Sequence, residues 1–317
     1  MPDIDALKAE AKRILDEGVV EMVIGFRAGD TPLHPQPAFF KTAEEVDALV
    51  YDPLCQNNLA AYLTRFPKTQ KIGMLVRGCE NRSVNALVFE GRHPREALYL
   101  IGVPCEGIID WRRIVENTGE EVISVVEQSG GAILVESKAG SFTFEKSALL
   151  HESCSRCIHP NPLSADVVIG EARPEGDPAL ARKEVVDFAA LPMEERNAWF
   201  RQEAERCIRC YACRKACPMC YCDPCFIDLD KPRWGEKAPG PGGNLMYHLT
   251  RFHHLAGRCI DCGECYRACP VDIPLHLFHK KVAKECEEMF GVAAGMKIDE
   301  KPALVDFRMD DSDAILE

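Results

Sequence analysis

The chain lacks the segments that would send it into or across a membrane. Its first residues, Met1 to Asp5, are acidic and have neither the basic nor the apolar region of a signal peptide. No apolar run approaches the about 20 residues that a membrane-spanning helix needs. We therefore expect a cytoplasmic protein without a membrane span. In that reducing compartment its 17 cysteines are expected to be free thiols or metal ligands rather than disulfides.

Several familiar signals of function are missing too. No G-x-G-x-x-G loop is present, so the sequence does not support a dinucleotide-binding Rossmann site. No acid–base or nucleophilic constellation typical of a catalytic site stands out. The net charge of −12 argues against nucleic acid as a partner, because nucleic acids select basic faces. Cysteine is what the chain has in excess, and its spacing carries the remaining inferences.

Two cysteine motifs of identical spacing lie in the C-terminal part. Both follow C-x-x-C-x-x-C-x-x-x-C-P, the pattern of two-cluster ferredoxins, and two complete copies are hard to explain by zinc or disulfides. The first three cysteines of each motif bind one cubane [4Fe–4S] cluster and the fourth binds the other, while the proline turns the chain away. We assign cluster A to Cys207, Cys210, Cys213 and Cys269, and cluster B to Cys259, Cys262, Cys265 and Cys217.

The N-terminal half alternates strand and helix patterns. Apolar runs over 19–24, 71–76 and 99–103 predict buried strands. Such alternation is typical of an α/β fold, a mostly parallel sheet with flanking helices. A further β pair is expected over 121–126 and 132–136. Helices are expected over 4–14, 42–50, 57–66, 83–89 and 107–115.

Four more cysteines form a possible third set. Cys79 and Cys105 each follow a predicted strand, and sites in parallel sheets form at the carboxyl ends of strands, so both are expected to face one crevice. Cys154 and Cys157 supply a C-x-x-C pair from a later loop. Together these thiols predict a third [4Fe–4S] cluster. The alternative is that Cys79 and Cys105 are small buried core residues.

The domain organisation follows from composition. A charged stretch containing Pro and Gly, residues 173–200, is expected to link an α/β domain at 1–172 to a dicluster ferredoxin domain at 201–317. Helical spacing over 244–256 and 274–289 favours an α-helical ferredoxin module over the compact β-rich type. The histidines between the motifs are expected to pack or to face solvent rather than to bind metal: His248, His253 and His254.

Three further cysteines, Cys220, Cys222 and Cys225, lie just after the first motif. Their close spacing is typical of metal ligands and predicts a further cluster or metal site, with Cys286 or Cys55 as candidates for a fourth ligand. The alternative is that the three are reduced thiols that shield cluster B.

Several segments resemble the beta-subunit family of deazaflavin-dependent hydrogenases and formate dehydrogenases. They are residues 76–82, residues 99–105, and the stretch from Cys154 to Cys157 with residues 165–170 after it. The C-terminal module is similar to those fused to formate dehydrogenase beta subunits and to helical ferredoxins of heterodisulfide-reductase systems. The resemblance implies an iron–sulfur cluster near an FAD. The family's Ser-Gly-Gly element is not recognisable near the N-terminus, which leaves FAD as an alternative rather than the main expectation.

We therefore predict a non-catalytic iron–sulfur electron-relay subunit of a cytoplasmic anaerobic oxidoreductase complex. The complex would be of the formate dehydrogenase, hydrogenase or heterodisulfide-reductase type. Its other subunits, including a heterodisulfide-reductase-like flavoprotein, would be the partners. The alternative is a flavin-containing beta subunit that itself oxidises or reduces a deazaflavin or nicotinamide coenzyme at the crevice of Cys79 and Cys105.

The crossed ligand assignment predicts different effects for two nearby substitutions. Cys213→Ser should disrupt cluster A, whereas Cys217→Ser should disrupt cluster B, because the fourth cysteine of a motif serves the other cluster. EPR spectra of the reduced single variants, recorded during potentiometric titration, distinguish the two signals. If Cys217→Ser perturbs the same signal as Cys213→Ser, the crossed assignment is wrong.

Overall fold

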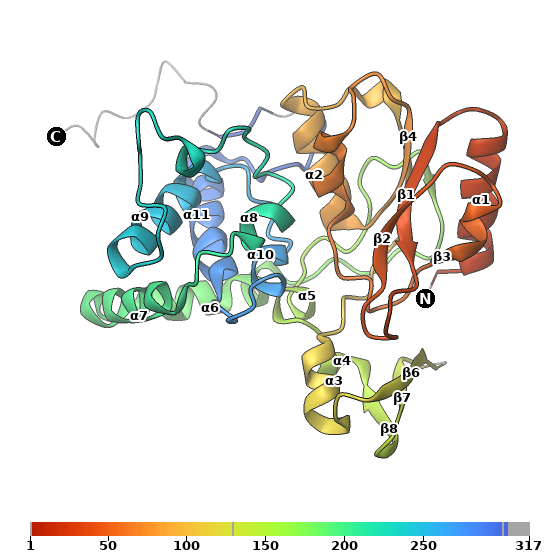
Figure 1. Cartoon of the computed structure of the whole chain (residues 1–317), viewed down its shortest axis with the longest axis horizontal. Helices are drawn as coiled ribbons and strands as arrows, with labels where there is room; N and C mark the ends of the chain where they lie inside the picture. Colours follow the sequence, from red (N-terminus) through yellow and green to blue (C-terminus); the bar gives the residue numbers. More distant parts are fainter. Residues whose placement is uncertain (1, 129, 300, 304–317) are drawn as a thin grey trace.

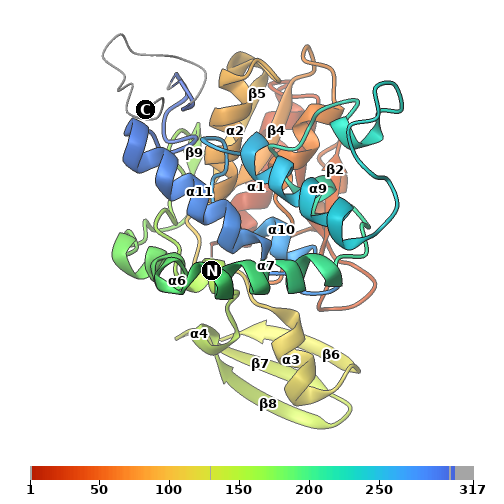
Figure 2. The ribbon, with the colours of Figure 1, turned by 90° about the vertical axis from the view of Figure 1, so that its left-hand side faces the viewer.

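The computed structural model describes residues 2–128, 130–299 and 301–303. The N-terminal residues form an α/β layer. The C-terminal residues form a helical part that lies beside this layer (Figure 1). A small antiparallel sheet projects from the rest of the described chain, at the bottom of Figure 2. The candidate site cysteines lie in the first two of these parts.

The main sheet is mostly parallel, as predicted. Its strand order is β2-β1-β4-β5-β9, with β3 pairing with β1 outside this path. The pairs β1–β4, β4–β5 and β5–β9 are parallel, whereas β2 and β3 run antiparallel to β1. The bounds are β1 Met22–Arg27, β2 Gln36–Phe40, β3 Leu49–Val50, β4 Ile72–Val76, β5 Leu98–Gly102 and β9 Val167–Val168.

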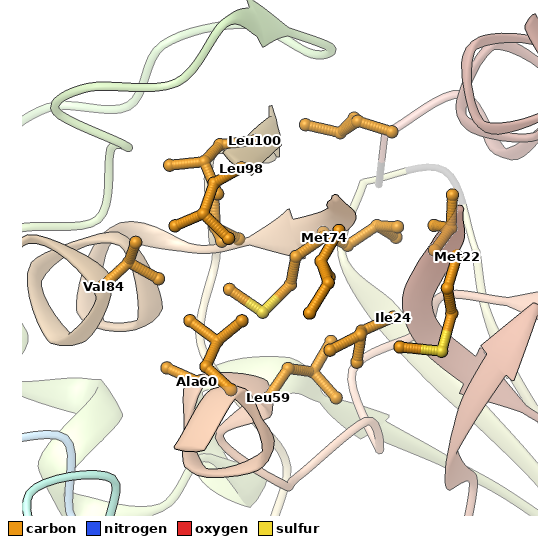
Figure 3. Packing of buried hydrophobic residues seen from close by; sticks show 14 of the residues in the cluster. Met22, Ile24, Leu59, Ala60, Met74, Val84, Leu98 and Leu100 are labelled. Carbon is orange, nitrogen blue, oxygen red and sulfur yellow. The ribbon is translucent and has the colours of Figure 1, made fainter. Parts of the chain in front are cut away.

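Helices cover both faces of this sheet. Helix α1 (Ile4–Asp16) begins at Asp3, whose side chain accepts hydrogen bonds from the first-turn amides, and it buries Leu7, Ala11 and Ile14. Helix α2 (Gly78–Phe89) connects β4 to β5. Between them the core contains Met22, Ile24 and Met74 from the strands, with Leu59, Ala60 and Val84 packed beside them (Figure 3).

Two predicted helices of the N-terminal half are not α-helices. The segment 42–50 forms a short 3₁₀ helix, η1 (Glu45–Ala48), followed by β3, because Leu49 pairs with Arg27 of β1. The segment 57–66 is the 3₁₀ helix η2 (Leu59–Arg65). The strands β2 and β9 were not predicted, since sheet pairing rather than local sequence creates them.

The predicted β pair belongs to a three-stranded antiparallel sheet. Its order is β6-β7-β8, with bounds Val122–Glu127, Ala132–Ser137 and Gly140–Glu145. Helices α3 (Trp111–Thr118) and α4 (Lys146–Leu149) accompany it. Ile114, Ile133, Val135 and Leu149 belong to a core of its own. The unit is therefore a separate packing cluster without any candidate ligand cysteine.

The C-terminal part is helical, in agreement with the predicted type of ferredoxin module. Among the described residues after Val168 no strand occurs. Aromatic rings gather around Phe278, with Phe188, Trp199 and Phe252 in ring contact with it. Its elements are α6 Pro178–Ala190, α7 Met193–Arg206, α8 Ala212–Ala216, η4 Phe226–Asp228, α9 Pro241–His254, α10 Glu264–Arg267 and α11 Leu275–Phe290.

The stretch that the sequence suggests as a linker is largely helical and packed. Phe188 of α6 and Trp199 of α7 both contact the ring of Phe278 on α11. The domain bounds 1–172, 173–200 and 201–317 stay a prediction, and residues 304–317 of the last lie outside the described part. No helix in the described ranges has the length and apolar content to cross a membrane.

Helix α2 forms the seam between the α/β layer and the helical part. Arg82 donates from its guanidinium to the carbonyls of Ala294 and Ile260, at 2.8 and 3.2 Å. Glu90, just after α2, pairs with Arg258 at 2.6 Å. These contacts join α2 to loops of the helical part, so cysteines on the two sides lie close together.

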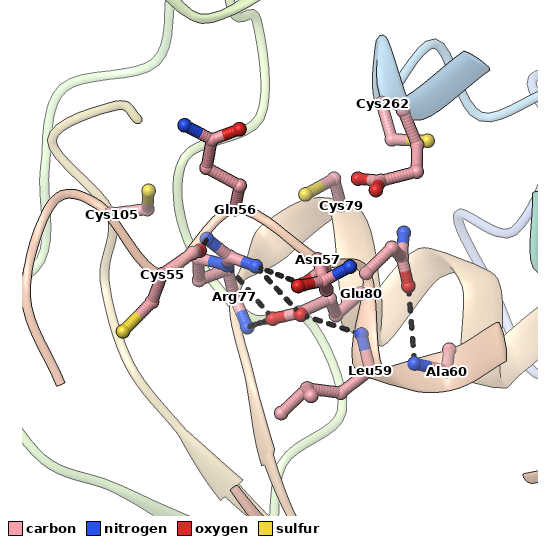
Figure 4. Close-up of polar contacts among 12 residues, drawn as sticks. Cys55, Gln56, Asn57, Leu59, Ala60, Arg77, Cys79, Glu80, Cys105 and Cys262 are labelled. Carbon is pink, nitrogen blue, oxygen red and sulfur yellow. Dashed lines mark hydrogen bonds and ion pairs between the residues drawn. The ribbon is translucent and has the colours of Figure 1, made fainter. Parts of the chain in front are cut away.

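A buried ion pair at the start of α2 is expected to be essential for stability. Arg77 and Glu80 are 3% and 1% exposed and lie 2.8 Å apart. Arg77 also donates to the carbonyls of Cys55 and Asn57, as Figure 4 shows. Arg77→Met should destabilise the fold by about 3–5 kcal/mol, because it leaves a buried carboxylate without its partner.

Urea unfolding followed by circular dichroism measures this effect. The matched control is Lys138→Met, which removes an exposed pair with Glu121 and should cost less than about 1 kcal/mol. Equal shifts of the unfolding midpoint in the two variants would refute the structural role of the buried pair.

Candidate iron–sulfur centres

The two cysteine motifs repeat in backbone conformation as well as in sequence. Arg209 and Tyr211 in the first motif have φ angles of 56° and 62°. The matching residues of the second, Asp261 and Gly263, have φ angles of 58° and 73°. Residues in this left-handed region turn successive amides toward one side, which makes a concave site for anions such as iron–sulfur clusters.

The amides in these loops do reach the sulfurs. The backbone N–H of Arg209 donates to Sγ of Cys207 at 3.4 Å. The amide of Asp261 donates in the same way to Cys259. Burial raises the pKa of Cys259 to about 12, and this hydrogen bond opposes the rise. Hydrogen bonds of this kind stabilise thiolates and tune the potential of a bound cluster. The donor set therefore fits a cluster in both loops.

The thiols expected to bind cluster A come together from both motifs. Burial raises the pKa of Cys207, and the neighbouring thiols of Cys269 and Cys210 raise it further. Burial also raises the pKa of Cys213, with added contributions from Cys207 and Cys269. Cys269 belongs to the second motif, so the structure brings together the four residues that the crossed pattern groups.

A single cavity is lined by all four cysteines expected to bind cluster B. Cys217 reaches it from the first motif, and Cys259, Cys262 and Cys265 reach it from the second. Arg251 lines the same cavity. Burial raises the pKa of Cys265, while the guanidinium of Arg251 opposes the rise.

The four cysteines of the N-terminal set also meet. Cys79 is the second residue of α2, just after β4, and Cys105 follows β5. Burial raises the pKa of Cys157 to about 12, and the thiols of Cys154 and Cys105 contribute to the rise. Burial likewise raises the pKa of Cys79, with Cys262 and Cys105 among the neighbours that add to it.

Two close backbone approaches bring the N-terminal set to the helical part. A Cβ at Gly78 would lie 2.1 Å from the carbonyl oxygen of His159, and one at Gly263 would lie 2.2 Å from Oγ of Ser153. Glycine at these positions lets the loop of Cys154 lie between α2 and the second motif. Figure 4 shows Cys79 with Cys105 on one side and Cys262 on the other.

His248 contacts the sulfur of a candidate ligand, a contact that the sequence did not predict. Its Nε2 lies 3.3 Å from Sγ of Cys207. Burial, together with the nearby guanidinium groups of Arg251 and Arg209, lowers the pKa of His248 to about 3. The ring is therefore neutral near pH 7 and can donate from Nε2 to the sulfur. Helical periodicity alone predicts a packing residue here, and no signal in the sequence indicates this hydrogen bond.

The remaining cysteines divide into two groups. Cys220, Cys222 and Cys225 line one cavity beside α9. A hydrogen bond with Cys217, together with the guanidinium of Arg251, lowers the pKa of Cys220. Neither suggested fourth ligand lies there: Cys55 is in the α/β core with 0% exposure, and Cys286 packs against Ala256 and Ala303. Those two suggestions are therefore wrong.

The spacing of the sulfurs distinguishes clusters from single ions. Ligands of a tetrahedral zinc lie about 3.8 Å apart, given Zn–S bonds of about 2.3 Å. Among the described residues, the one trio of His, Cys, Asp or Glu ligand atoms within 4.8 Å of one another is Glu152, Glu184 and His276. Arg156 and Lys280 already pair with Glu184 in that trio, which disfavours a cation. No cysteine trio in the described ranges is that compact.

Comparisons with known proteins agree with this chemistry. Residues 255–274, which contain the whole second motif, match the family model "4Fe-4S binding domain". The chain is 24% identical to the F420-dependent formate dehydrogenase subunit beta of Methanocaldococcus jannaschii, over 88% of each chain. It is 22% identical to the F420-dependent formate dehydrogenase 1 subunit beta of Methanococcus maripaludis, over 94% of this chain and 92% of the relative.

A solved structure is more distantly similar. A chain of the F420-reducing [NiFe] hydrogenase complex from Methanosarcina barkeri aligns with a TM-score of 0.39 at 18% identity, over 49% of this chain and 59% of that one. The sequence matches are the informative ones. The protein is a homologue of formate dehydrogenase beta subunits and carries a 4Fe-4S binding domain, which confirms the resemblance drawn from its motifs.

The contact of His248 predicts a shift in one reduction potential. His248→Phe keeps a buried ring of similar size but removes the donor to Cys207, so the midpoint potential of cluster A should fall. The control is His253→Phe on the same helix, where the side chain is exposed. EPR-monitored titration of both variants tests this. An unchanged potential in His248→Phe would exclude a hydrogen bond to a ligating sulfur.

Proposed function

We propose that this chain is an electron-transfer subunit in which three [4Fe–4S] clusters form a single relay within an oxidoreductase complex. The observation that supports it is the serial order of the three cysteine sets. Cys213 of the first set is among the thiols that raise the pKa of Cys265 in the second, after burial itself. Cys262 of the second set likewise raises the pKa of Cys79 in the third set. These contributions support a relay in which the second set lies between the other two.

Exposure of the sulfur ligands fits a relay with two ends. The residues Cys210 in the first set and Cys157 in the third are exposed, although the thiol of Cys157 itself lies deep enough for burial to raise its pKa. In the middle set all four cysteines are buried or half-buried. A buried middle cluster with more accessible outer clusters lets electrons enter at one end and leave at the other.

Buried cations lie beside the middle set and suit this task. Arg251 donates to the carbonyl of Cys213 at 3.0 Å, and the thiol of Cys220, followed by thiols of the first and second sets, raises its pKa against the effect of burial. Arg82, on the other side, has Asp261, Cys157 and Cys259 around it. Positive charge near a cluster favours the reduced, more negative form. These arginines would keep the reduction potentials of the clusters within the range in which electrons can move along the relay in either direction.

The proposed setting follows the relatives. Two of them are named as beta subunits of F420-dependent formate dehydrogenases, so we expect this chain to deliver electrons to, or accept them from, other subunits of a related complex. A cytoplasmic location is part of the proposal, because thiols in this number stay reduced there. Formate dehydrogenase, hydrogenase and heterodisulfide-reductase-like subunits are the candidate partners.

A flavin-containing subunit is the second candidate. The crevice at Cys105 has a volume of about 40 Å³, against roughly 300–1,000 Å³ for small-molecule sites. A cavity of about 340 Å³ lies beside Cys79 and Cys157 and is the larger space near the N-terminal set. Flavin quantified after anaerobic purification separates the two: one flavin per chain would favour this candidate, and its absence would favour the relay.

The third cluster of the relay can be tested by metal content. Cys157→Ala should lower iron by about four atoms per chain relative to the unmodified protein, because a cubane that loses a ligand is lost or degraded. Cys286→Ala, a buried cysteine outside every set, is the control and should leave iron unchanged. Iron and acid-labile sulfide are measured on anaerobically purified full chains. Full iron content in Cys157→Ala would rule out a cluster at the N-terminal set.

A further inference from the structure

One cavity of the helical part is not used by the three-cluster relay. Its volume is about 290 Å³, and it lies against α9. Cys220, Cys222 and Cys225 all line it, and none of them belongs to the three sets above. Cys217 lines both this cavity and that of the second set. An occupant would therefore lie directly beside cluster B.

Two buried polar groups on the wall of this cavity have no hydrogen-bond partner among the described residues. Tyr247 is 2% exposed, and its hydroxyl is unpartnered. Arg251 is 3% exposed, and its Nε is unpartnered. Both residues line the cavity. Because buried polar groups are nearly always hydrogen-bonded, these two indicate an occupant with acceptor atoms.

The charge of the wall indicates an anionic occupant. The two carboxylates that line it are Asp223 and Asp228, and Asp228 already pairs with Arg214 at 2.9 Å. Arg251 donates to the carbonyl of Cys213 and contacts His279, and it also hydrogen-bonds the sulfur of Cys220 on the same wall. The cations on the wall are Arg65, Arg214, Lys215, Arg251 and Arg258, of which Arg258 is paired with Glu90. A cluster with its thiolates carries net negative charge and fits such a wall.

We propose that Cys220, Cys222 and Cys225 hold a fourth iron–sulfur cluster, a [4Fe–4S] cubane with three protein thiolates and one iron facing the open side of the cavity. Each iron of a cubane takes one outer ligand, so three thiolates leave one iron for a ligand from solvent. Cys222 is exposed, which identifies the accessible side. The ligand class for that iron is a small thiolate. Zinc fits less well, because these sulfurs do not form a compact trio in the described ranges.

Metal analysis of the full chain tests the fourth cluster directly. Cys222→Ala and Cys225→Ala should each lose about four irons per chain, while the relay clusters keep their iron. The control is again Cys286→Ala, which should keep all its iron. The unmodified protein should contain about sixteen irons per chain. Adding 2-mercaptoethanol should alter one EPR signal, and that signal should be missing from Cys222→Ala.

Four results would overturn the proposal. The first is full iron and sulfide content in both Cys222→Ala and Cys225→Ala, and the second is the loss of one zinc instead of iron. The third is about twelve irons per chain in the unmodified protein. The fourth is an EPR spectrum that does not change when 2-mercaptoethanol is added. The iron count of the unmodified protein keeps the test valid if a variant fails to fold. Failure here is separable from failure of the relay, since the relay depends on the iron lost in Cys157→Ala.

Discussion

The balance between buried thiols and buried guanidinium groups is the constraint on which the rest of this structure depends. Burial raises the pKa of Cys79 and Cys265, and a hydrogen bond with Cys220 together with burial raises that of Cys217, yet metal ligation requires the thiolate form. Arg77 and Arg251 oppose the rise at these thiols. A buried cation is in turn stable only when negative charge surrounds it. Cluster binding and folding are therefore coupled, because each set of charges is costly without the other.

This coupling explains why the two halves of the chain pack closely against each other. Met219 and Leu255, which flank the cavities of the helical part, pack into the same hydrophobic cluster as the strands β1 and β4. Arg82 and Asn85 of α2 bond to carbonyls near residue 294, more than 200 positions further along the chain. Close contact across α2 is what brings Cys79 within range of Cys262. A loosely linked pair of domains would leave these thiols apart.

The spacing of cysteines predicted which thiols are grouped where those cysteines are close in the chain. The repeated motifs of Cys207 and Cys259 predicted grouped thiols, and the apolar runs predicted the parallel strands. Two kinds of feature could not be predicted. Strand β3 exists because Leu49 pairs with Arg27, and His248 reaches Cys207 across 41 residues. Both depend on tertiary contacts that leave no local pattern, whereas a metal-ligand motif must appear in the sequence itself.

The central claim is that the second set lies between the other two and connects them. Spin–spin coupling between reduced clusters, seen as broadened EPR signals in the fully reduced protein, tests it most directly. Removing the middle cluster with Cys265→Ser should narrow the signals of both remaining clusters, because each loses its neighbour. Removing the first cluster with Cys207→Ser should leave the N-terminal signal broadened. An N-terminal signal that stays broadened in Cys265→Ser and narrows in Cys207→Ser would contradict the order of the relay.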